Sequence, residues 1–448
     1  MPTQEEEQEM KHFNVSDVTE RFIRYASIYT QSKEGVPDTP STLCQFNLAR
    51  LLRGELEEMG AAEVSLDEEK CYVYATIPGN IPADPAAVAA LPDAGAKRRE
   101  NLAPIIGLIA HMDTTDAVDA SSHPFILPRR IDDYDGGSIV LNEALGITCG
   151  PEEYPDLAGQ RGKTLVVTDG TTVLGGDDKA GITQIMEAAG FFLSHPEIAH
   201  GTIRIMFTPD EEVGNGIMNM DTGRFAVDYA YTVDSTDVGR LEYECFNAAA
   251  AEVLIEGLST HPGSAKGRMR NAVLLAMEFN SLLPAGQTPA DTEGYEGFWH
   301  LCEMSGTTEK AKMDYIIRDH DRSTFEARKE MLLQIAAGMN LRYGADVVRV
   351  RVRDSYYNME EKIRPHMHLV EVAKAAICEV GLEPLVAPIR GGTDGAMLSF
   401  RGIPCPNLGT GAHCIHSQYE YAVGEEMVLG AEILLRILNR YASYELDG

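Results

Sequence analysis

The sequence predicts an α/β protein built from a larger domain, with a mainly parallel mixed sheet flanked by helices, and a smaller inserted βαββαβ domain. Two observations carry this prediction. In the larger part, apolar runs rich in β-formers alternate with helical patterns, and a self-contained order of strands and helices then interrupts that alternation. At 448 residues, the chain is long enough for two or three domains.

Four apolar runs define the larger domain: IIGLIAH, KTLVVTD, GTIRIMFTP and YAYTVD, at residues 105–111, 163–169, 201–209 and 229–234. Helical patterns such as KAGITQIMEAAGFFLSHP lie among them. Buried strands that alternate with helices are typical of a largely parallel sheet. Active sites of such sheets lie beyond the carboxyl ends of the strands. Polar residues that close or follow these runs are therefore the candidates for function.

The inserted domain is expected at residues 246–357. Strand patterns cover 248–257, 297–306, 311–321 and 346–357, and helical patterns cover 271–283 and 323–341. This βαββαβ order predicts a ferredoxin-like fold. The larger domain is then discontinuous, with residues 1–245 and 358–448, and a cleft between two domains is a natural substrate site. A Pro- and Ala-rich stretch at 79–104 is predicted to be a surface loop.

Composition and charge exclude several classes of function. The formal net charge of −31 argues against nucleic-acid partners and anionic membranes, which would be repelled. No apolar run approaches the roughly 18 residues of a transmembrane helix. The acidic, polar start differs from a secretory leader, and the eight cysteines are scattered rather than arranged as a disulfide framework. We therefore expect a cytoplasmic protein.

Five short segments carry residues that suit a two-metal hydrolase. They are GLIAHMDT with His111 and Asp113, LGGDDKAG with Asp177 and Asp178, TPDEEVGNG with Glu211 and Glu212, YTVDS with Asp234, and GAHCIHSQYE with His416. Each segment alone is weak evidence. Together they offer two histidines and three carboxylates as ligands, with one carboxylate left to act as a base.

The ligand types favour zinc, which accepts histidine nitrogen and carboxylate oxygen at about 2.0–2.2 Å. We assign His111, Asp177 and Asp234 to one ion, and Asp177, Glu212 and His416 to the other. Asp177 then bridges, because paired ions about 3.5–4 Å apart share a ligand. A bridging hydroxide would neutralise the charge that remains on the pair and would be the attacking group. Spacing alone leaves His413 as an alternative to His416.

Two carboxylates are expected beside the ligands rather than among them. His111 and Asp113 are two residues apart, so in an extended segment they point to the same side, and Asp113 could fix the tautomer of His111. The adjacent Glu211 and Glu212 diverge from an extended backbone. We therefore expect Glu212 to bind metal and Glu211 to move the proton between water and the leaving amine.

With these segments, the stretches TVDSTDVGRLEYECFNAA, HPGSAKG, DTEGYEGFWHL, YIIRDHDR, DSYYNM and IRGGTDGAMLSF resemble the peptidase T family. This family comprises cytoplasmic tripeptide aminopeptidases of the dizinc exopeptidase superfamily. The resemblance runs from about residue 10 to 445, apart from the Pro/Ala loop. It implies a catalytic α/β domain with an inserted lid domain, two zinc ions for which cobalt or manganese could substitute, and short peptides as substrates.

The resemblance also implies a role for each matching residue. The family's metal ligands fall on His111, Asp177, Glu212, Asp234 and His416, and the spacing to Glu420 and Met427 selects His416 over His413. Asp113 matches the carboxylate that supports His111, and Glu211 matches the general base. The Asp177–Asp178 bond matches a cis peptide bond of the family.

Three further matches concern the substrate. His261 in THPG corresponds to a histidine near the lid hinge that contacts substrate or the oxyanion. Arg318 and Arg390 correspond to arginines that hold the terminal carboxylate of the peptide, and a guanidinium binds a carboxylate through two parallel hydrogen bonds. An ion pair of Arg318 with Asp319 or Asp321 is the alternative for that residue.

Two departures from the family bear on specificity. Ser235, Thr236 and Asp237 follow Asp234 where glycines are usual, and GAHCIHSQYE stands in place of YNYHGKHE. The expected function is zinc-dependent release of the N-terminal residue of a tripeptide. The alternatives are a related dizinc amidohydrolase or dipeptidase that acts on an acylated amino acid or another short peptide, and a non-catalytic metal- or peptide-binding protein. Edge strands of the inserted domain could pair two subunits, so a homodimer is one option.

Overall fold

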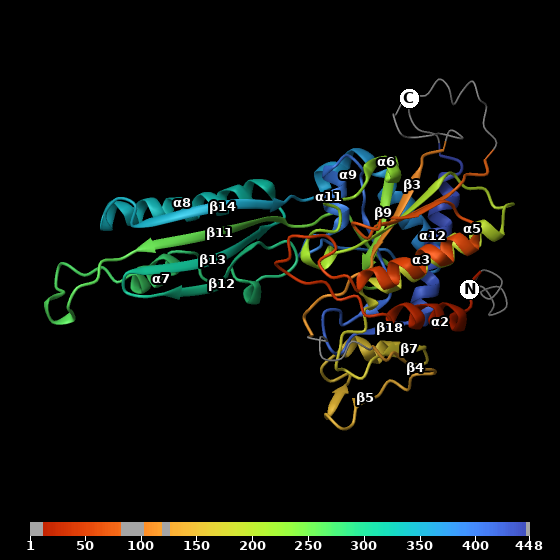
Figure 1. Ribbon diagram of the computed structural model, residues 1–448, viewed down its shortest axis with the longest axis horizontal. Coiled ribbons are helices and arrows are strands. Elements are labelled where there is room, and N and C mark those ends of the chain that lie inside the picture. Colours follow the sequence, from red (N-terminus) through yellow and green to blue (C-terminus); the bar gives the residue numbers. More distant parts are fainter. Residues whose placement is uncertain (1–11, 82–102, 119–125, 445–448) are drawn as a thin grey trace, which may run out of the picture. The chain divides into compact units, whose positions relative to one another are not determined.

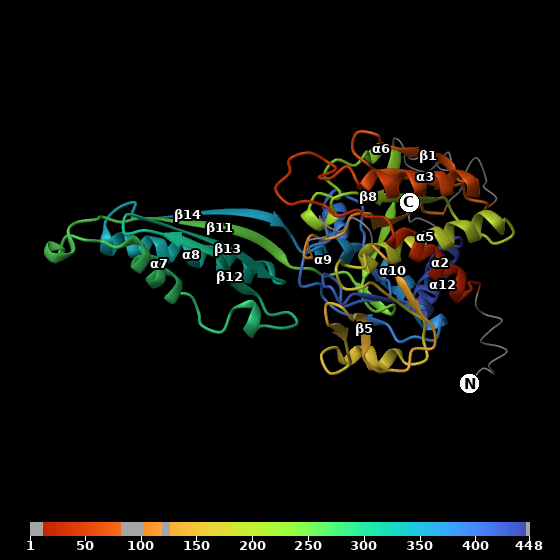
Figure 2. The ribbon, with the colours of Figure 1, turned by 60° about the horizontal axis from the view of Figure 1, so that its bottom comes forward.

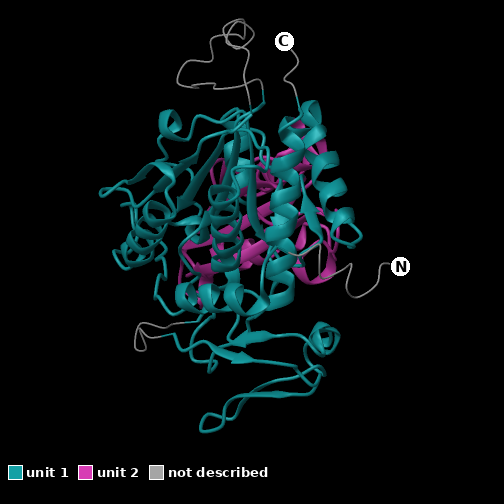
Figure 3. Cartoon of the chain, turned by 90° about the vertical axis from the view of Figure 1, so that its right-hand side faces the viewer, with its two compact units in different colours: residues 1–243, 362–386, 393–448 teal, residues 244–361, 387–392 magenta. Residues whose placement is uncertain are grey.

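The computed structural model describes residues 12–81, 103–118 and 126–444. The chain divides into two compact units (Figure 3). Unit 1 comprises residues 1–243, 362–386 and 393–448, and unit 2 comprises 244–361 and 387–392. Residues 387–392 were expected in the larger domain but cluster with unit 2. Most of the predicted loop at 79–104, namely 82–102, lies outside the described residues, as does the acidic start at 1–11.

An eight-stranded mixed sheet forms the centre of unit 1 (Figure 1). Its order is β1 (Ala62–Leu66), β2 (Val73–Ile77), β8 (Ile203–Thr208), β3 (Ile106–His111), β9 (Tyr229–Ser235), β16 (Asn407–Gly409), β10 (Arg240–Glu242) and β15 (Leu385–Val386). The neighbours β8–β3, β3–β9, β9–β16 and β10–β15 are parallel. The other three pairs are antiparallel. The prediction of a mainly parallel mixed sheet flanked by helices is confirmed.

Helices bury both faces of this sheet. Helix α5 (Gly176–Ser194) packs against β3 and β9, and α2 (Val15–Ala26) and α12 (Gly424–Tyr441) lie beside it (Figures 1 and 2). Helix α3 (Gln45–Met59) covers β1 and β2, and α10 (His368–Glu379) packs against α12. The short helices α6 (Thr222–Phe225) and α11 (Asp394–Phe400) contribute to a separate apolar cluster with β3 and β8. Every residue of β2, β3 and β8 is buried, which explains their uninterrupted apolar sequences.

One predicted strand lies in a different sheet from its expected neighbours. Strand β7 (Leu165–Val167) pairs antiparallel with β18 (Tyr421–Val423) and β4 (Arg129–Ile131), and β17 (Ala412–His413) completes this second sheet. A short hairpin of β5 (Ile139–Asn142) and β6 (Ile147–Cys149) packs into the same apolar cluster. A buried apolar run shows that a strand forms, but it does not show which sheet the strand joins.

Unit 2 has the predicted βαββαβ order. Its elements are β11 (Asn247–Glu256), α7 (Ala272–Ser281), β12 (Phe298–Gly306), β13 (Lys310–Asp319), α8 (Arg322–Tyr343) and β14 (Val348–Tyr356). The strands form one antiparallel sheet in the order β12-β13-β11-β14. Alternate residues of β11, from Ala249 to Ile255, are buried against both helices, so the helices cover one face. This confirms the ferredoxin-like prediction.

Candidate metal centre

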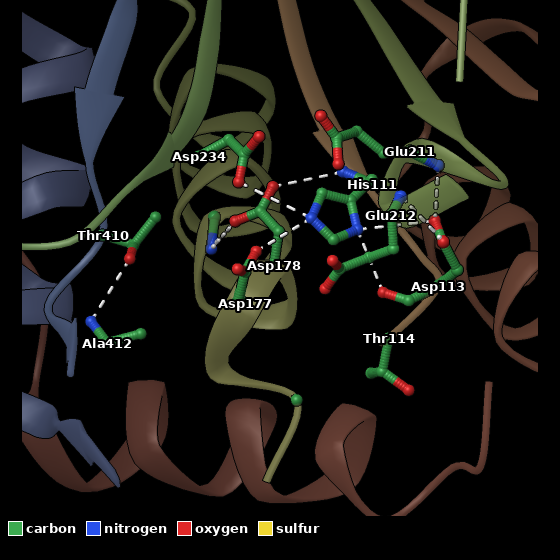
Figure 4. A network of polar contacts seen from close by, with 12 residues as sticks. His111, Asp113, Thr114, Asp177, Asp178, Glu211, Glu212, Asp234, Thr410 and Ala412 are labelled. Atoms are coloured by element: carbon green, nitrogen blue, oxygen red, sulfur yellow. Dashed lines mark hydrogen bonds and ion pairs between the residues drawn. The ribbon is translucent and has the colours of Figure 1, made fainter. Parts of the chain in front are cut away.

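The predicted ligands of unit 1 lie at the carboxyl ends of central strands of the large sheet, or in segments that approach those ends. His111 is the last residue of β3, Asp177 lies in the first turn of α5, and Asp234 is near the end of β9. Glu211 and Glu212 begin the short turn Glu211–Val213, which starts three residues after the end of β8, and His416 lies between β17 and β18. Figure 4 shows the carboxyl groups of Asp177, Asp234, Glu211 and Glu212 gathered around the ring of His111.

Asp177 stands between the two histidines. The Nε2 atom of His111 lies 2.9 Å from Asp177 Oδ1 and 3.5 Å from Asp234 Oδ1. The Nε2 atom of His416 lies 3.1 Å from Asp177 Oδ2 and 3.0 Å from Glu212 Oε2. Each oxygen of Asp177 thus faces a different histidine. This is the arrangement that a bridging carboxylate requires.

Two overlapping sets of potential ligand atoms result. In one, atoms of His111, Asp177 and Glu212 all lie within 4.8 Å of one another. In the other, atoms of His111, Glu211 and Asp234 satisfy the same limit. Asp234 thus shares a set with Glu211, which was expected to act as a base rather than as a ligand.

His413, the alternative to His416, faces another partner. Its Nε2 atom lies 2.7 Å from Glu426 Oε2, and its ring stacks on Tyr421. Lys163 contacts the other oxygen of Glu426 at 2.7 Å, so this glutamate is shared between two basic groups. His413 is buried in that contact. Of the two histidines, His416 is the one beside Asp177 and Glu212.

Asp113 is fully buried and contacts both His111 and the turn that carries the glutamates. The Nδ1 atom of His111 lies 3.0 Å from the main-chain oxygen of Asp113 and 3.5 Å from its Oδ1. The carboxylate accepts hydrogen bonds from the main-chain N–H groups of Glu211, at 3.0 Å, and Glu212, at 3.2 Å. The second contact was not foreseen from the sequence.

Two further carboxylates hold the segment around Asp177. Glu420 accepts hydrogen bonds from the N–H groups of Gly175, at 2.8 Å, and Asp177, at 2.9 Å. Asp178 accepts from the N–H of His111 at 3.1 Å, and the Asp177–Asp178 peptide bond is cis. A Cβ at Gly176 would lie 3.0 Å from Glu420 Oε1, so this close approach favours glycine. In the sequence, Glu420 is used only for its spacing to His416. Its place in the same motif as His416 is a signal that it also belongs to the site.

The electrostatics of the cluster favour a bound cation. Burial raises the pKa of Asp234 to about 7 and also raises the pKa of Glu211. Burial alone would lower the pKa of His111, but Asp234, Asp113 and Asp177 raise it well above its ordinary value. Hydrogen bonds to Asp177 and Glu212 raise the pKa of His416 to about 11. Buried carboxylates thus hold protons, or share those of the histidines, where a cation would replace them.

The side chains present fit the expected zinc ions. The donors are histidine nitrogen and carboxylate oxygen, which zinc accepts. In the described part of the chain, Glu212 Oε1 is buried and has no hydrogen-bond partner. An unpaired buried carboxylate oxygen is costly unless a cation or a donor meets it. A metal at this position would satisfy that oxygen.

The three residues expected to bind substrate belong to unit 2. His261 is exposed, and its Nδ1 accepts from the N–H of Gly263 at 3.2 Å. The Nη1 atom of Arg318 donates to the main-chain oxygens of Ile317, at 3.0 Å, and Ala249, at 3.4 Å, and the guanidinium lies over the ring of Tyr356. No ion pair of Arg318 with Asp319 or Asp321 is found among the described residues.

Arg390 binds a loop of its own unit. Its Nη1 atom donates to the main-chain oxygens of Gly294, at 2.8 Å, and Glu296, at 3.0 Å. Its Nη2 atom donates to the main-chain oxygen and hydroxyl of Thr292, at 3.2 and 2.9 Å. The guanidinium also lies over the ring of Phe246. Binding of a substrate carboxylate by Arg390 therefore stays a prediction, and it would have to compete with these contacts.

Known proteins are similar to this chain in sequence and in fold. The family model described as Peptidase family M20/M25/M40 matches residues 173–440. A curated relative, Peptidase T of Geobacillus kaustophilus (strain HTA426), is 46% identical over 425 residues, which cover 95% of this chain and 98% of the relative.

No helix in the described residues has both the length and the apolar character needed to cross a membrane.

Solved structures agree on the fold. The crystal structure of aminopeptidase PepT from Bacillus cereus ATCC 10987 matches with a TM-score of 0.72 and 22% identity. The match covers 97% of this chain and 100% of that protein's chain. A dinuclear metal binding peptidase of the M20 family from Bacillus subtilis matches with a TM-score of 0.60 and 14% identity, covering 95% and 98%. The sequence matches confirm the resemblance to peptidase T, and they show that this chain belongs to peptidase family M20/M25/M40 and is a metallo-exopeptidase that hydrolyses peptide bonds.

Proposed function

We propose that this enzyme is a zinc-dependent aminopeptidase that releases the N-terminal residue of tripeptides. The observation that carries the proposal is the cluster in which Asp177 faces His111 with one oxygen and His416 with the other. The peptidase T relative supports the substrate class. The eight free cysteines suit a reducing compartment, so we propose a cytoplasmic location.

The proposed ligands divide between two sites that share Asp177. His111, Asp177 and Asp234 would hold one ion, and Asp177, Glu212 and His416 the other. When bound, zinc ions would supply Lewis-acid chemistry and would lower the pKa of a bound water molecule. The contacts of Asp113 to His111, Glu211 and Glu212 keep two of these ligands and the proposed base in fixed relative positions.

Glu211 is the proposed general base. Its carboxylate belongs to the set around His111 and Asp234, and it is not paired with His416 as Glu212 is. It would take the proton of the attacking water and pass it to the amine that leaves. Burial raises the pKa of this carboxyl above its ordinary value, and a raised pKa favours proton uptake by a general base.

Residues of unit 2 would recognise the rest of the peptide. We propose that His261 contacts the substrate or the oxyanion, and that Arg318 and Arg390 hold the far carboxylate. Recognition of both ends of the peptide would make peptide length the basis of selection. The loop at residues 292–296, which Arg390 contacts, would then contribute to the site.

A homodimer through unit 2 is part of the proposal. Leu274 and Met277 on α7 and Leu341 on α8 are 61%, 59% and 91% exposed. The strands β12 and β14 are the edges of the sheet, and such edges can pair with a second copy. Light scattering at several concentrations checks this expectation, and a monomer at all concentrations would contradict it.

The activity is tested with unblocked di-, tri- and tetrapeptides and with an N-acetylated tripeptide, together with metal analysis of the purified enzyme. We expect the free tripeptide to give the highest kcat/KM, the acetylated form to be inert, and about two zinc ions per chain. Chelation should abolish turnover and added zinc should restore it. Faster cleavage of the acetylated substrate would favour the amidohydrolase, and no turnover with zinc bound would favour a binding protein.

A further inference from the structure

The adjacent glutamates of the candidate site directly follow a residue with an unusual backbone conformation. Asp210 has φ 58° and ψ 26°, in the left-handed region, and it directly precedes the turn Glu211–Val213. Side chains other than glycine rarely adopt this conformation, although aspartate tolerates it better than most. Within this turn, Glu212 faces His416, whereas Glu211 belongs to the set around His111 and Asp234.

A buried contact from the start of α3 holds Asp210 in that conformation. The Asp210 carboxylate accepts from the N–H of Ser41 at 2.7 Å, from Ser41 Oγ at 2.6 Å, and from Gln45 Nε2 at 2.7 Å. In return, the main-chain N–H of Asp210 donates to Gln45 Oε1 at 3.2 Å. The side-chain amide of Gln45 thus contacts Asp210 at two points. Both Gln45 and Asp210 are completely buried, with 0% exposure.

The next two amides of the turn are held from the opposite segment. The N–H groups of Glu211 and Glu212 both donate to Asp113. Three consecutive amides therefore end on side chains that lie far away in the sequence. Ser41 is itself fixed, because its Oγ accepts from the N–H of Lys33 at 2.9 Å. The segment before α3 consequently contributes to the position of both glutamates.

We propose that Ser41 and Gln45 are positioning residues for the catalytic turn, acting through Asp210 on the base Glu211 and the ligand Glu212. This inference rests on the proposed roles of those two glutamates. A misplacement of about 1 Å at a reacting group costs about 10²-fold in rate. Partners that hydrogen-bond to metal ligands or orient them are worth about 10–100-fold in metal affinity or activity.

The test compares Ser41→Ala and Gln45→Leu with the wild-type enzyme. Ser41→Ala removes one hydrogen bond to Asp210 but keeps the main-chain contact, and Gln45→Leu removes both contacts of the amide at similar volume. We expect kcat for a tripeptide to fall about 10–100-fold, with KM changed less than about twofold. Zinc titration by calorimetry should show the affinity for one of the two ions weakened by about tenfold or more.

Matched controls separate positioning from general damage. Leu43 lies between the two residues and is 78% exposed, so Leu43→Ala should leave kcat and both zinc affinities unchanged. Ser41→Thr keeps the hydroxyl and should restore most of the rate that Ser41→Ala loses. Melting temperature is followed for every variant, and Ser41→Ala remains informative if Gln45→Leu does not fold.

Normal kcat and normal zinc affinities in Ser41→Ala and Gln45→Leu would overturn the proposal. So would an equal loss in Leu43→Ala, or a loss of melting temperature with both zinc affinities intact. The zinc titration needs no peptide. If the wild-type enzyme bound two ions but cleaved no tripeptide, the proposed function would fail while the positioning of Glu212 could still be measured.

Discussion

At the scale of single residues, the cluster is notable for the different surroundings of two adjacent glutamates. Glu212 contacts His416 through one oxygen, and its other oxygen is buried without a hydrogen-bond partner among the described residues. Glu211 lies near His111 and Asp234, and burial is the main cause of its raised pKa. One glutamate therefore presents a buried oxygen that lacks a partner among the described residues, and the other presents a carboxylate near His111 and Asp234.

Replacing each glutamate by glutamine should separate the two roles. We expect Glu211→Gln to keep about two zinc ions but to lower kcat by about 10²–10⁴-fold, because the amide cannot accept the proton. Glu212→Gln should lose one ion, because an amide is a weaker ligand than a carboxylate. Metal analysis and tripeptide kinetics on the same preparations make the comparison. Full activity in Glu211→Gln would refute its role as the base.

At the scale of elements, the close approach of α5 to β9 sets the spacing of Asp177 and Asp234. Gly181 permits this approach, since a Cβ there would lie 1.9 Å from the main-chain oxygen of Val233 and 2.4 Å from Asp178 Oδ1. Gly190, on the same helix, has no atom nearer to such a Cβ than Met59 Sδ at 3.8 Å. The sequence GGDDKAG thus carries a packing requirement at Gly181 together with the proposed ligand Asp177.

A pair of alanine substitutions in α5 tests this requirement. Gly181→Ala should lower the free energy of unfolding by about 1–3 kcal/mol or more, because main-chain atoms of β9 would have to move. Gly190→Ala should raise it by about 0.5–1 kcal/mol, because alanine favours the helix and its Cβ would make only an ordinary van der Waals contact with Met59. Denaturant unfolding of both variants provides the measurement. Equal stability of the two variants would show that the close approach of α5 to β9 does not require glycine at position 181.

At the scale of the whole molecule, the metal centre concentrates part of a large negative charge. The chain carries a formal net charge of −31, and several of its acidic groups are buried together in unit 1. Without metal, the negative charge of this cluster is neutralised by bound protons. Hydrogen bonds to Asp177 and Glu212 raise the pKa of His416 to about 11, and burial raises the pKa of Asp234 to about 7.

Metal-free enzyme should therefore lose stability relative to zinc-loaded enzyme as pH rises from about 5 to 8. Asp234 and His416 bind protons more tightly when folded than when unfolded, so their contribution is present at low pH and is lost toward their folded pKa values. For Asp234 the window runs from 3.8 to about 7, and for His416 it begins at 6.5. The measurement is the difference in melting temperature between the two forms. Groups remote from the cluster contribute equally to both forms, and a gap that narrows with rising pH would contradict the expectation.

Local sequence patterns are enough to predict the elements and the donor chemistry. Apolar runs gave β3, β8 and β9, the βαββαβ order gave unit 2, and five short segments gave a donor set that suits zinc, because periodicity and residue type are local properties. The long motifs also gave the family.

Which segments meet is visible in the fold alone. It placed β7 in a separate sheet, His413 on Glu426, and Asp113 against the amide of Glu211, 98 positions away. It also placed the segment of Ser41 and Gln45 against Asp210, the residue before Glu211. The physical reason is that these contacts depend on how buried polar groups pair once distant segments pack together, and no local pattern records that pairing.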